Sequence, residues 1–270
     1  YARSGNPTRA ALETTIANLE GAARACAFAS GMAAITTSLM LLQQGDHVVV
    51  TRDCYGGTYR LFHRVLNRYG IEHSLANTSD LDEVRRAWRP NTRALYVETL
   101  SNPFLYVSDI AALADLAHER DALLFVDNTM LGPTLQRPLE QGADLVLHSA
   151  TKYLAGHSDV LAGVAATRTE ELGKELYFLQ NATGTVLGPM DCWLTLRGIK
   201  TLGVRMRKQE ETARRLAEWL CEQPEVEQVS YPGLPHHPGH KIAARQATGF
   251  GALLSFRLRP GLDGARFVQQ

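Results

Sequence analysis

The chain has 270 residues, of which 45% are hydrophobic and 21% are charged, a balance typical of one large globular domain or a domain and a half. A chain of this length can bury a sizeable core without disulfides or metal ions. Its 28 basic residues equal its 28 acidic residues in number. Zero net charge argues against nucleic acid or an anionic membrane surface as the main partner, since both select a basic excess.

The cysteine pattern indicates the redox compartment. The cysteines are widely separated and no CxxC pair occurs, which argues against a zinc ribbon, a redox motif and a secreted disulfide framework. We therefore predict buried thiols, a cytoplasmic protein and no metal site. The four cysteines are Cys26, Cys54, Cys192 and Cys221.

The first long apolar stretch, residues 25–42, has no formal charge over 18 residues, the minimum length for crossing a membrane. It contains Ser30, Thr36 and Ser38, and these hydroxyls favour a buried core helix over a membrane span. We therefore expect no membrane partner.

Apolar runs then alternate with amphipathic segments. The apolar runs are nearly continuous, which is typical of parallel strands covered on both faces. Strands that alternate with helices of about 10 to 15 residues favour an open α/β sheet, in which ligands bind beyond the carboxyl ends of the strands. The predicted strands are 46–51, 71–76, 93–98, 122–127, 143–148 and 161–167, and the predicted helices are 55–69, 79–88 and 108–120, with Ser79 and Ser108 as N-caps.

The pattern changes after residue 189. Residues 191–221 read as helix with an interruption near Gly198 or Gly203, and candidate strands follow at 226–231 and 251–258. We therefore predict a larger domain over residues 1–203 and an incomplete smaller α/β domain over residues 204–270.

Polar side chains follow three of the predicted strands. Glu98 and Asp127 end two strands, and the segment 148–152 follows a third. Pyridoxal phosphate (PLP) needs a lysine for a Schiff base, an acid for its pyridine nitrogen and a phosphate cradle. Of the five lysines, Lys152 lies beside hydroxyls that can reach a phosphate, and Lys200 is the only other serious candidate. Residues 30–32 supply a cradle, because N–H groups at a helix start favour phosphate.

Collinear motifs along the whole chain resemble the Cys/Met-metabolism family of PLP enzymes, which includes cystathionine γ-synthase, cystathionine and homocysteine γ-lyases, cystathionine β-lyase, methionine γ-lyase and O-acetylhomoserine sulfhydrylase. The matching stretches are YARSGNPTR (1–9), FASGMAA (28–34), DCYGGTYRLF (53–62), ETLSNP (98–103), VDNT (126–129), LQRPLEQGADLVLHSATKYLAGHSD (135–159), RGIKTLGVRM (197–206) and YPGLPHHPGH (231–240). The resemblance implies the type I fold of PLP-dependent transferases, with residues 1–203 as the PLP-binding domain.

The resemblance also implies roles for individual residues. Lys152 forms the Schiff base and moves protons, Asp127 pairs with the pyridine nitrogen, and Tyr55 stacks on the ring as a possible acid or base. Asn102 contacts the cofactor or the substrate carboxylate. The phosphate is held by Ser30, Gly31, Met32, Ser149 and Thr151, and by Tyr1 and Arg3 from the N-terminal arm 1–4 of a neighbouring subunit. The resemblance therefore implies a homo-oligomer, at least a dimer and usually a tetramer.

The implied activity is γ-carbon chemistry on a sulfur amino acid, of the cystathionine or homocysteine γ-lyase type, which releases α-ketobutyrate, ammonia and thiol. γ-Replacement on activated homoserine, by a cystathionine γ-synthase or O-acetylhomoserine sulfhydrylase, stays open. Gly57 replaces the reactive cysteine of methionine γ-lyases and argues against that member. The chain begins at Tyr1, and the segment that carries the family's substrate-carboxylate arginine is absent, so we expect a fragment; a non-catalytic PLP-binding relative is a further alternative.

Overall fold

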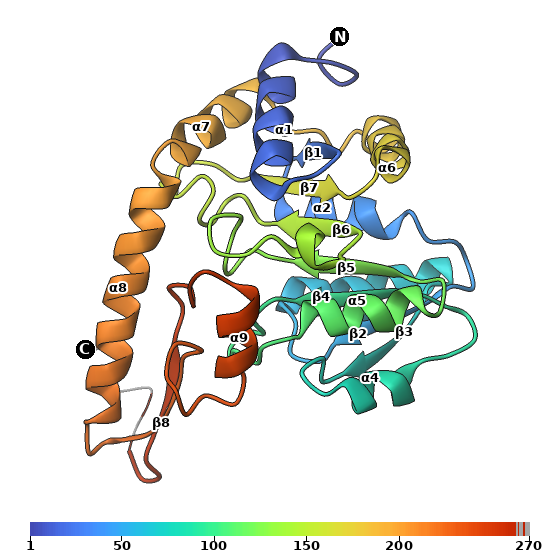
Figure 1. The fold of residues 1–270 in the computed structure, drawn as a ribbon. Coiled ribbons are helices and arrows are strands. Elements are labelled where there is room, and N and C mark those ends of the chain that lie inside the picture. The colour runs from blue at the N-terminus through green and yellow to red at the C-terminus, as the bar shows by residue number, and fades with distance from the viewer. Residues whose placement is uncertain (263, 265–266, 268–270) are drawn as a thin grey trace.

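The computed structural model describes residues 1–262, 264 and 267, and seven strands form its main sheet in the order β1-β7-β6-β5-β4-β2-β3 (Figure 1). Strand β7 runs antiparallel to β1 and β6, and the other pairings are parallel. The sheet is therefore the mostly parallel one that the sequence predicts. Its strands are β1 (Arg24–Phe28), β2 (His47–Thr51), β3 (Glu72–Ala76), β4 (Thr92–Glu98), β5 (Leu123–Asp127), β6 (Leu145–His148) and β7 (Gly163–Thr167).

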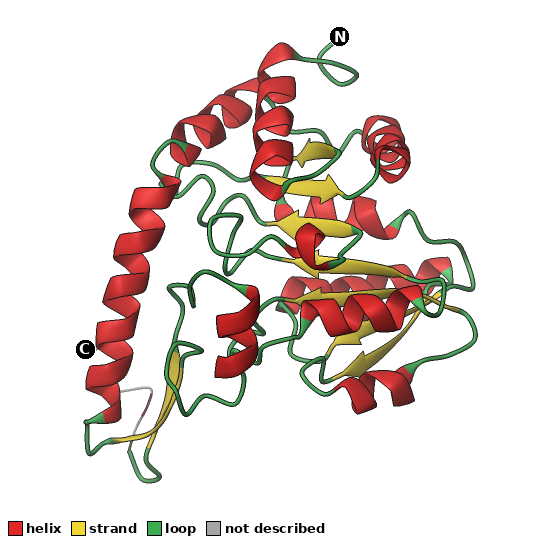
Figure 2. Cartoon of the chain, viewed as in Figure 1, coloured by secondary structure: helices red, strands yellow, loops and turns green. Residues whose placement is uncertain are grey.

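Helices cover both faces of this sheet (Figure 2). A two-stranded antiparallel sheet, β8 (Val226–Ser230) and β9 (Ser255–Leu258), lies apart from it. The helices are α1 (Pro7–Glu20), α2 (Gly31–Leu39), α3 (Gly56–Arg60), the π-helix η1 (Leu61–Val65), the 3-10 helix η2 (Leu66–Tyr69), α4 (Leu81–Ala87), α5 (Ile110–His118), the 3-10 helix η3 (Pro138–Gln141), α6 (Glu170–Thr183), α7 (Pro189–Ile199), α8 (Leu202–Cys221) and α9 (His240–Gln246).

Alternation along the strands divides the core into two layers, because successive side chains of a strand point to opposite faces. Val126 of β5 packs in the layer that contains Leu113 of α5. Its neighbour Phe125 packs in the other layer, with Ile35 of α2 and Phe62 of η1. Burial on both faces explains why the strands read as continuous apolar runs.

The predicted helix over residues 25–42 is wrong in its first half. Residues 24–28 form β1, which pairs with β7, and only 31–39 are helical. The apolar composition of the run fits either element, since a short buried strand and a buried helix segment have the same apolar content. No helix of the described residues is long and apolar enough to cross a membrane.

The two predicted N-caps are each displaced by one residue. Asp80 caps α4, accepting hydrogen bonds from the backbone N–H groups of Asp82 and Glu83, while Ser79 donates its hydroxyl to Asn77 at 2.8 Å. Asp109 likewise caps α5 in place of Ser108. An ionised carboxylate accepts more strongly than a hydroxyl, and its charge also favours a helix N-terminus.

Helices α1, α6 and α9 are not among the predicted elements. The start of α1 has a readable signal, because Asn6 accepts from the backbone N–H groups of Thr8 and Arg9, and Pro7 occupies the first helical position. The predicted interruption of the helix over 191–221 is confirmed, since α7 ends at Ile199 and α8 starts at Leu202.

The predicted domain boundary falls in the first turn of α8. Leu202 and Met206 of this helix pack in the main core, whereas Ala213 and Ala217 pack in a separate small cluster that includes β8. The prediction of four buried thiols is wrong for Cys221, which is exposed at the end of α8, while the other three cysteines are buried.

Candidate active site

The carboxyl ends of β4, β5 and β6 face a cavity of about 170 Å³. This position is the one that an open α/β sheet predicts for its ligand. The cavity brings together most of the residues that the sequence marks. Its lining comprises Ser30, Gly31, Met32, Ile35, Tyr55, Glu98, Asp127, Thr129, Met130, His148, Ser149, Thr151, Lys152 and Leu161.

Three predicted site residues lie outside this lining: Tyr1, Arg3 and Asn102. Tyr1 is 91% exposed at the N-terminus, and the guanidinium of Arg3 donates to the backbone and side-chain oxygens of Asn181. Asn102 is exposed, and its backbone N–H donates a hydrogen bond to the carbonyl oxygen of Asp53 at 3.3 Å. The role of the arm 1–4 in a neighbouring subunit stays a prediction.

The first wall of the cavity is the N-terminus of α2. Ser30 caps this helix and accepts from the N–H of Ala33 at 3.0 Å. A Cβ atom on Gly31 would lie 2.9 Å from Cβ of Ser149, and one on Gly163 would lie 2.1 Å from the carbonyl oxygen of Ser30. Only glycine allows these close approaches, which leave the first backbone N–H groups of α2 beside the Ser149 hydroxyl. Such an arrangement fits a phosphate group.

Substitution of Gly31 tests this packing. We expect Gly31→Ala to lower the free energy of unfolding by about 1–3 kcal/mol, because the added methyl overpacks a tight contact. We also expect about tenfold weaker PLP binding, measured by fluorescence titration of the cofactor-free protein, which corresponds to about 1.4 kcal/mol. Gly203→Ala in α8 is the control, since its Cβ would meet only Arg207 at 3.8 Å. Equal losses in both variants would contradict a specific role for Gly31.

The second wall is an acidic centre at the end of β5. Asp127 accepts from the backbone N–H of Thr129 at 3.0 Å and from its hydroxyl at 2.5 Å, and from the Tyr96 hydroxyl at 3.2 Å. Burial raises the pKa of Tyr96 well above its usual range, and the carboxyls of Asp127 and Glu98 raise it further, so Tyr96 stays a donor. Three hydrogen bonds thus orient the Asp127 carboxylate.

Thr129 extends this network to the lysine segment. Its hydroxyl oxygen accepts from the backbone N–H of Ser149 at 2.8 Å, and the carbonyl of Ser149 in turn accepts from the N–H of Lys152 at 3.0 Å. One threonine therefore connects the acidic end of β5 to the turn that carries the lysine. Thr129 lies in the VDNT motif (126–129) but had no predicted role, since nothing in the spacing shows that its hydroxyl bridges two strand ends.

Glu98 is a second carboxyl in the lining that had no assigned role. It pairs in register with Asp127 on the neighbouring strand, and its Oε1 accepts from the backbone N–H of Tyr55 at 2.7 Å. Burial, followed by the charge of Asp127, raises the pKa of Glu98 to about 8. Glu98 therefore holds the start of α3 as a mostly protonated acid at neutral pH.

This raised pKa makes the stability of the cofactor-free protein depend on pH. The folded state keeps the Glu98 proton that the unfolded chain loses near pH 4.5, so stability falls as pH rises toward about 8. The amide of Glu98→Gln still accepts from Tyr55 but cannot ionise. We expect thermal unfolding midpoints that agree with the wild type at pH 4, below the pKa of the unfolded chain, and exceed it at pH 8. A difference between the two proteins that is independent of pH would contradict the raised pKa.

Lys152 and Tyr55 complete the cavity. The side chain of Lys152 is exposed, and Tyr55 precedes α3 with 53% of its surface exposed. A Cβ on Gly57 would lie 2.4 Å from the Tyr55 ring and 2.8 Å from the sulfur of Met32. Glycine at position 57 therefore lets the Tyr55 ring pack against the helix start, beside the N-terminus of α2.

A buried pair that the sequence does not predict begins at the cavity lining, with His148. Nε2 of His148 is 2.5 Å from Oε1 of Glu20, at the end of α1, and both side chains are almost completely buried. Burying an imidazole or a carboxyl group alone is unfavourable, and the contact between the two groups offsets that cost. The contact fixes the end of β6, immediately before Ser149.

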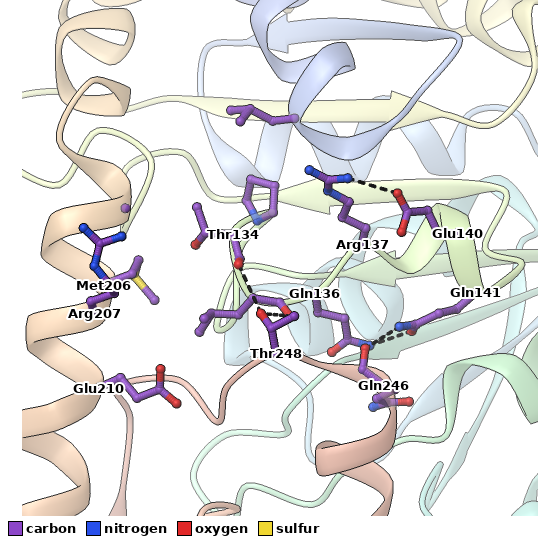
Figure 3. Close-up of a pocket in the computed structure, with 14 residues that line it drawn as sticks. Thr134, Gln136, Arg137, Glu140, Gln141, Met206, Arg207, Glu210, Gln246 and Thr248 are labelled. Carbon is purple, nitrogen blue, oxygen red and sulfur yellow. Dashed lines mark hydrogen bonds and ion pairs between the residues drawn. The ribbon is translucent and has the colours of Figure 1, made fainter.

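A larger cavity of about 620 Å³ lies between η3 and α8 (Figure 3). Two pairs of its polar side chains contact each other: Arg137 pairs with Glu140 at 3.1 Å, and Gln136 donates to Gln141 at 2.8 Å. Its lining contains none of the predicted site residues. The smaller cavity is therefore the candidate active site.

Comparison with known proteins agrees with this geometry. The family model for the Cys/Met metabolism PLP-dependent enzymes matches residues 1–270. The chain belongs to this family. The chain is 58% identical to cystathionine beta-lyase MetC of Bacillus subtilis over 258 residues, which are 96% of the chain and 66% of that protein. It is 54% identical to cystathionine gamma-lyase of the same organism, over 95% of the chain and 68% of that protein.

Structural comparison gives the same family. Cystathionine gamma-lyase from Lactobacillus plantarum, solved with L-serine, superposes with a TM-score of 0.98 at 47% identity, over 100% of the chain and 71% of that protein. The fold is therefore the predicted type I fold of PLP-dependent enzymes. The chain spans about two thirds of the length of the curated relatives it matches.

Proposed function

We propose that the protein is a PLP-dependent carbon–sulfur lyase that acts on cystathionine at its γ-carbon and releases α-ketobutyrate, ammonia and cysteine. The observation that carries the proposal is the meeting of a lysine, an oriented carboxylate and a helix N-terminus at one cavity. These are the three groups that PLP requires. Relatives named as γ-lyase and β-lyase support carbon–sulfur chemistry on cystathionine.

The residues of the chain fit the cofactor at three points. The N–H groups at the start of α2 and the hydroxyls of Ser149 and Thr151 would hold its phosphate, Asp127 would hold a proton on its ring nitrogen, and Lys152 would bind its aldehyde carbon. When bound, PLP supplies an electron sink for a carbanion at the substrate Cα. The Asp127 carboxylate would keep the ring nitrogen protonated, and the three donors from Thr129 and Tyr96 hold this carboxylate in position.

Proton transfer in the proposed reaction belongs to Lys152. Its Nζ would take the proton from the substrate Cα and would later return a proton to the carbon chain. A neutral amine is needed for the first step, and a cationic neighbour such as the ring nitrogen favours the neutral form. Tyr55, beside the same cavity, is the group proposed to cover the ring and to exchange protons with the departing sulfur.

The products of cystathionine cleavage test the proposal. The full-length protein, loaded with PLP, is incubated with L-cystathionine, and α-ketobutyrate, pyruvate, cysteine and homocysteine are quantified. Equal amounts of α-ketobutyrate and cysteine support the γ-lyase. Pyruvate with homocysteine would overturn it in favour of the β-lyase reaction of the Bacillus subtilis relative.

A γ-replacement reaction is the second arm of the test. The chain is 52% identical to cystathionine gamma-synthase of Mycobacterium tuberculosis H37Rv over 98% of its length. An absence of keto acid from cystathionine, with cystathionine formed from an O-acylhomoserine and cysteine, would replace the lyase by a synthase.

The proposal includes a homo-oligomer in which Tyr1 and Arg3 reach a neighbouring cavity, and Arg3→Ala is then expected to weaken PLP binding.

A further inference from the structure

The buried pair of His148 and Glu20 joins a helix end to the candidate active site. His148 is the last residue of β6 and lines the cavity, and Glu20 is the last residue of α1. Their side chains are 2% and 0% exposed, and Nε2 of His148 is 2.5 Å from Oε1 of Glu20. At this separation one of the two atoms must donate a proton to the other. The proposed reaction uses neither group.

The alternation along β6 predicts an apolar residue at position 148. Val146 points to the same face of the strand and packs in the core layer that also contains Leu12 and Ile16 of α1. Replacing a buried polar pair by apolar residues of similar size is often neutral or stabilising, so stability alone does not explain the histidine. Residues that break a local pattern in this way are expected at functional sites.

The carboxyl group of Glu20 depends on this one contact. Its second oxygen, Oε2, is buried without a hydrogen-bond partner among the described residues. Gly21, with a φ of 67°, ends α1 immediately after it, and a helix C-terminus disfavours a negative charge. The helix itself packs against β1 and β7 (Figure 1). The contact with His148 therefore holds the carboxyl group and ties the end of α1 to the end of β6.

Ser149 follows His148 directly and belongs to the proposed phosphate cradle. A Cβ atom on Gly31 would lie 2.9 Å from Cβ of Ser149, and the N–H of Ser149 donates to the Thr129 hydroxyl at 2.8 Å. The carbonyl of Ser149 accepts from the N–H of Lys152 at 3.0 Å. A group that binds a ligand must be held to within about 0.5 Å by the contacts around it. A displaced strand end would therefore move the serine hydroxyl away from the start of α2.

We propose that Glu20 and His148 are positioning residues for phosphate binding: their contact keeps the Ser149 hydroxyl beside the N-terminus of α2, where the phosphate of PLP would bind. This role rests on the proposed placement of that phosphate. Because the pair acts through Ser149, its loss is expected to weaken binding of the phosphate more than binding of the rest of the cofactor. Losing one hydrogen bond to a charged group weakens binding by about tenfold or more.

The preference of the full-length protein for PLP over pyridoxal, which lacks the phosphate, tests the pair. Both affinities are measured by fluorescence titration after the cofactor is removed. We expect Glu20→Leu to lower the ratio of the two affinities by about tenfold. The matched control is Glu13→Leu in the same helix, because Glu13 is 17% exposed and its Oε1 accepts from the N–H of Ala27 in β1 at 2.9 Å. We expect the control to lose stability and to keep the ratio.

A double variant separates positioning from stability. Glu20→Leu leaves the imidazole of His148 buried without its partner, which can prevent folding. Combining it with His148→Leu replaces both groups by apolar ones, so we expect wild-type stability with a ratio that is still about tenfold lower. A double variant with the wild-type ratio would overturn the role of the pair alone, as would a control that loses as much as Glu20→Leu. A wild type without a preference for PLP would overturn the phosphate placement as well.

Phosphorus NMR of the full-length, PLP-loaded protein gives a second readout. Glu20→Gln keeps an amide oxygen that accepts from His148, so its phosphate signal is expected to match that of the wild type. The signal of the double leucine variant is expected to shift, because the Ser149 hydroxyl is displaced. Equal signals in the wild type and the double variant would overturn the proposal. Neither readout uses turnover, so a failure of the proposed reaction would leave both tests unaffected.

Discussion

Lys152→Ala is expected to abolish the visible absorption band of the PLP-loaded protein and to lower turnover of cystathionine by at least about 10⁴-fold. The substitution removes both the amine that holds the cofactor and the base that takes the substrate proton, and each role alone contributes factors of this order. The phosphate cradle at α2 is untouched, so PLP is expected to bind weakly and reversibly. The measurements are an absorbance spectrum after gel filtration and a keto-acid assay.

The matched control is Lys200→Ala. Lys200 is the other lysine that the sequence marks as a candidate, and it is exposed at the end of α7, outside the lining of the cavity. We expect this variant to keep both the visible band and the turnover. A band that survives in Lys152→Ala and is lost in Lys200→Ala would reverse the assignment.

The sheet could be predicted from the sequence because its physical cause is local. Burial on both faces selects apolar β-branched runs. The strands predicted from these runs agree with the bounds of β2 to β7 to within a few residues. Strand β1 could not be separated from α2, because the residues 24–28 pair with β7 more than a hundred residues away. That long-range pairing leaves no trace in the local pattern.

The same distinction applies to the candidate site. Asp127 and Lys152 are readable, since each follows an apolar strand that has no need of a charge. Glu98 was visible as a strand end but lacked a role, because its contact with the N–H of Tyr55 depends on how α3 packs. The pairing of Glu20 with His148 joins residues that are 128 positions apart, and it therefore requires the tertiary structure.

Asp127→Asn is expected to lower kcat by about 10²- to 10³-fold, the usual effect of removing one oriented electrostatic partner from a reacting centre. The asparagine side chain keeps the size of aspartate but has no charge to hold a proton on the ring nitrogen. Because Lys152 and the cradle at α2 remain, the visible band and the KM are expected to change little. Steady-state kinetics with cystathionine measure both quantities.

The structure also predicts a local change in this variant. Three groups donate to the Asp127 carboxylate, from Thr129 and Tyr96, and an amide nitrogen at one of the two oxygen positions cannot accept from them. Asp82→Asn, on the exposed side of α4, is the control for a neutralised aspartate outside the site. If Asp127→Asn retained kcat within about threefold of the control, the carboxylate charge would contribute less than about 1 kcal/mol to the reaction, and the acidic end of β5 would orient the lysine turn through Thr129 without supporting the cofactor ring.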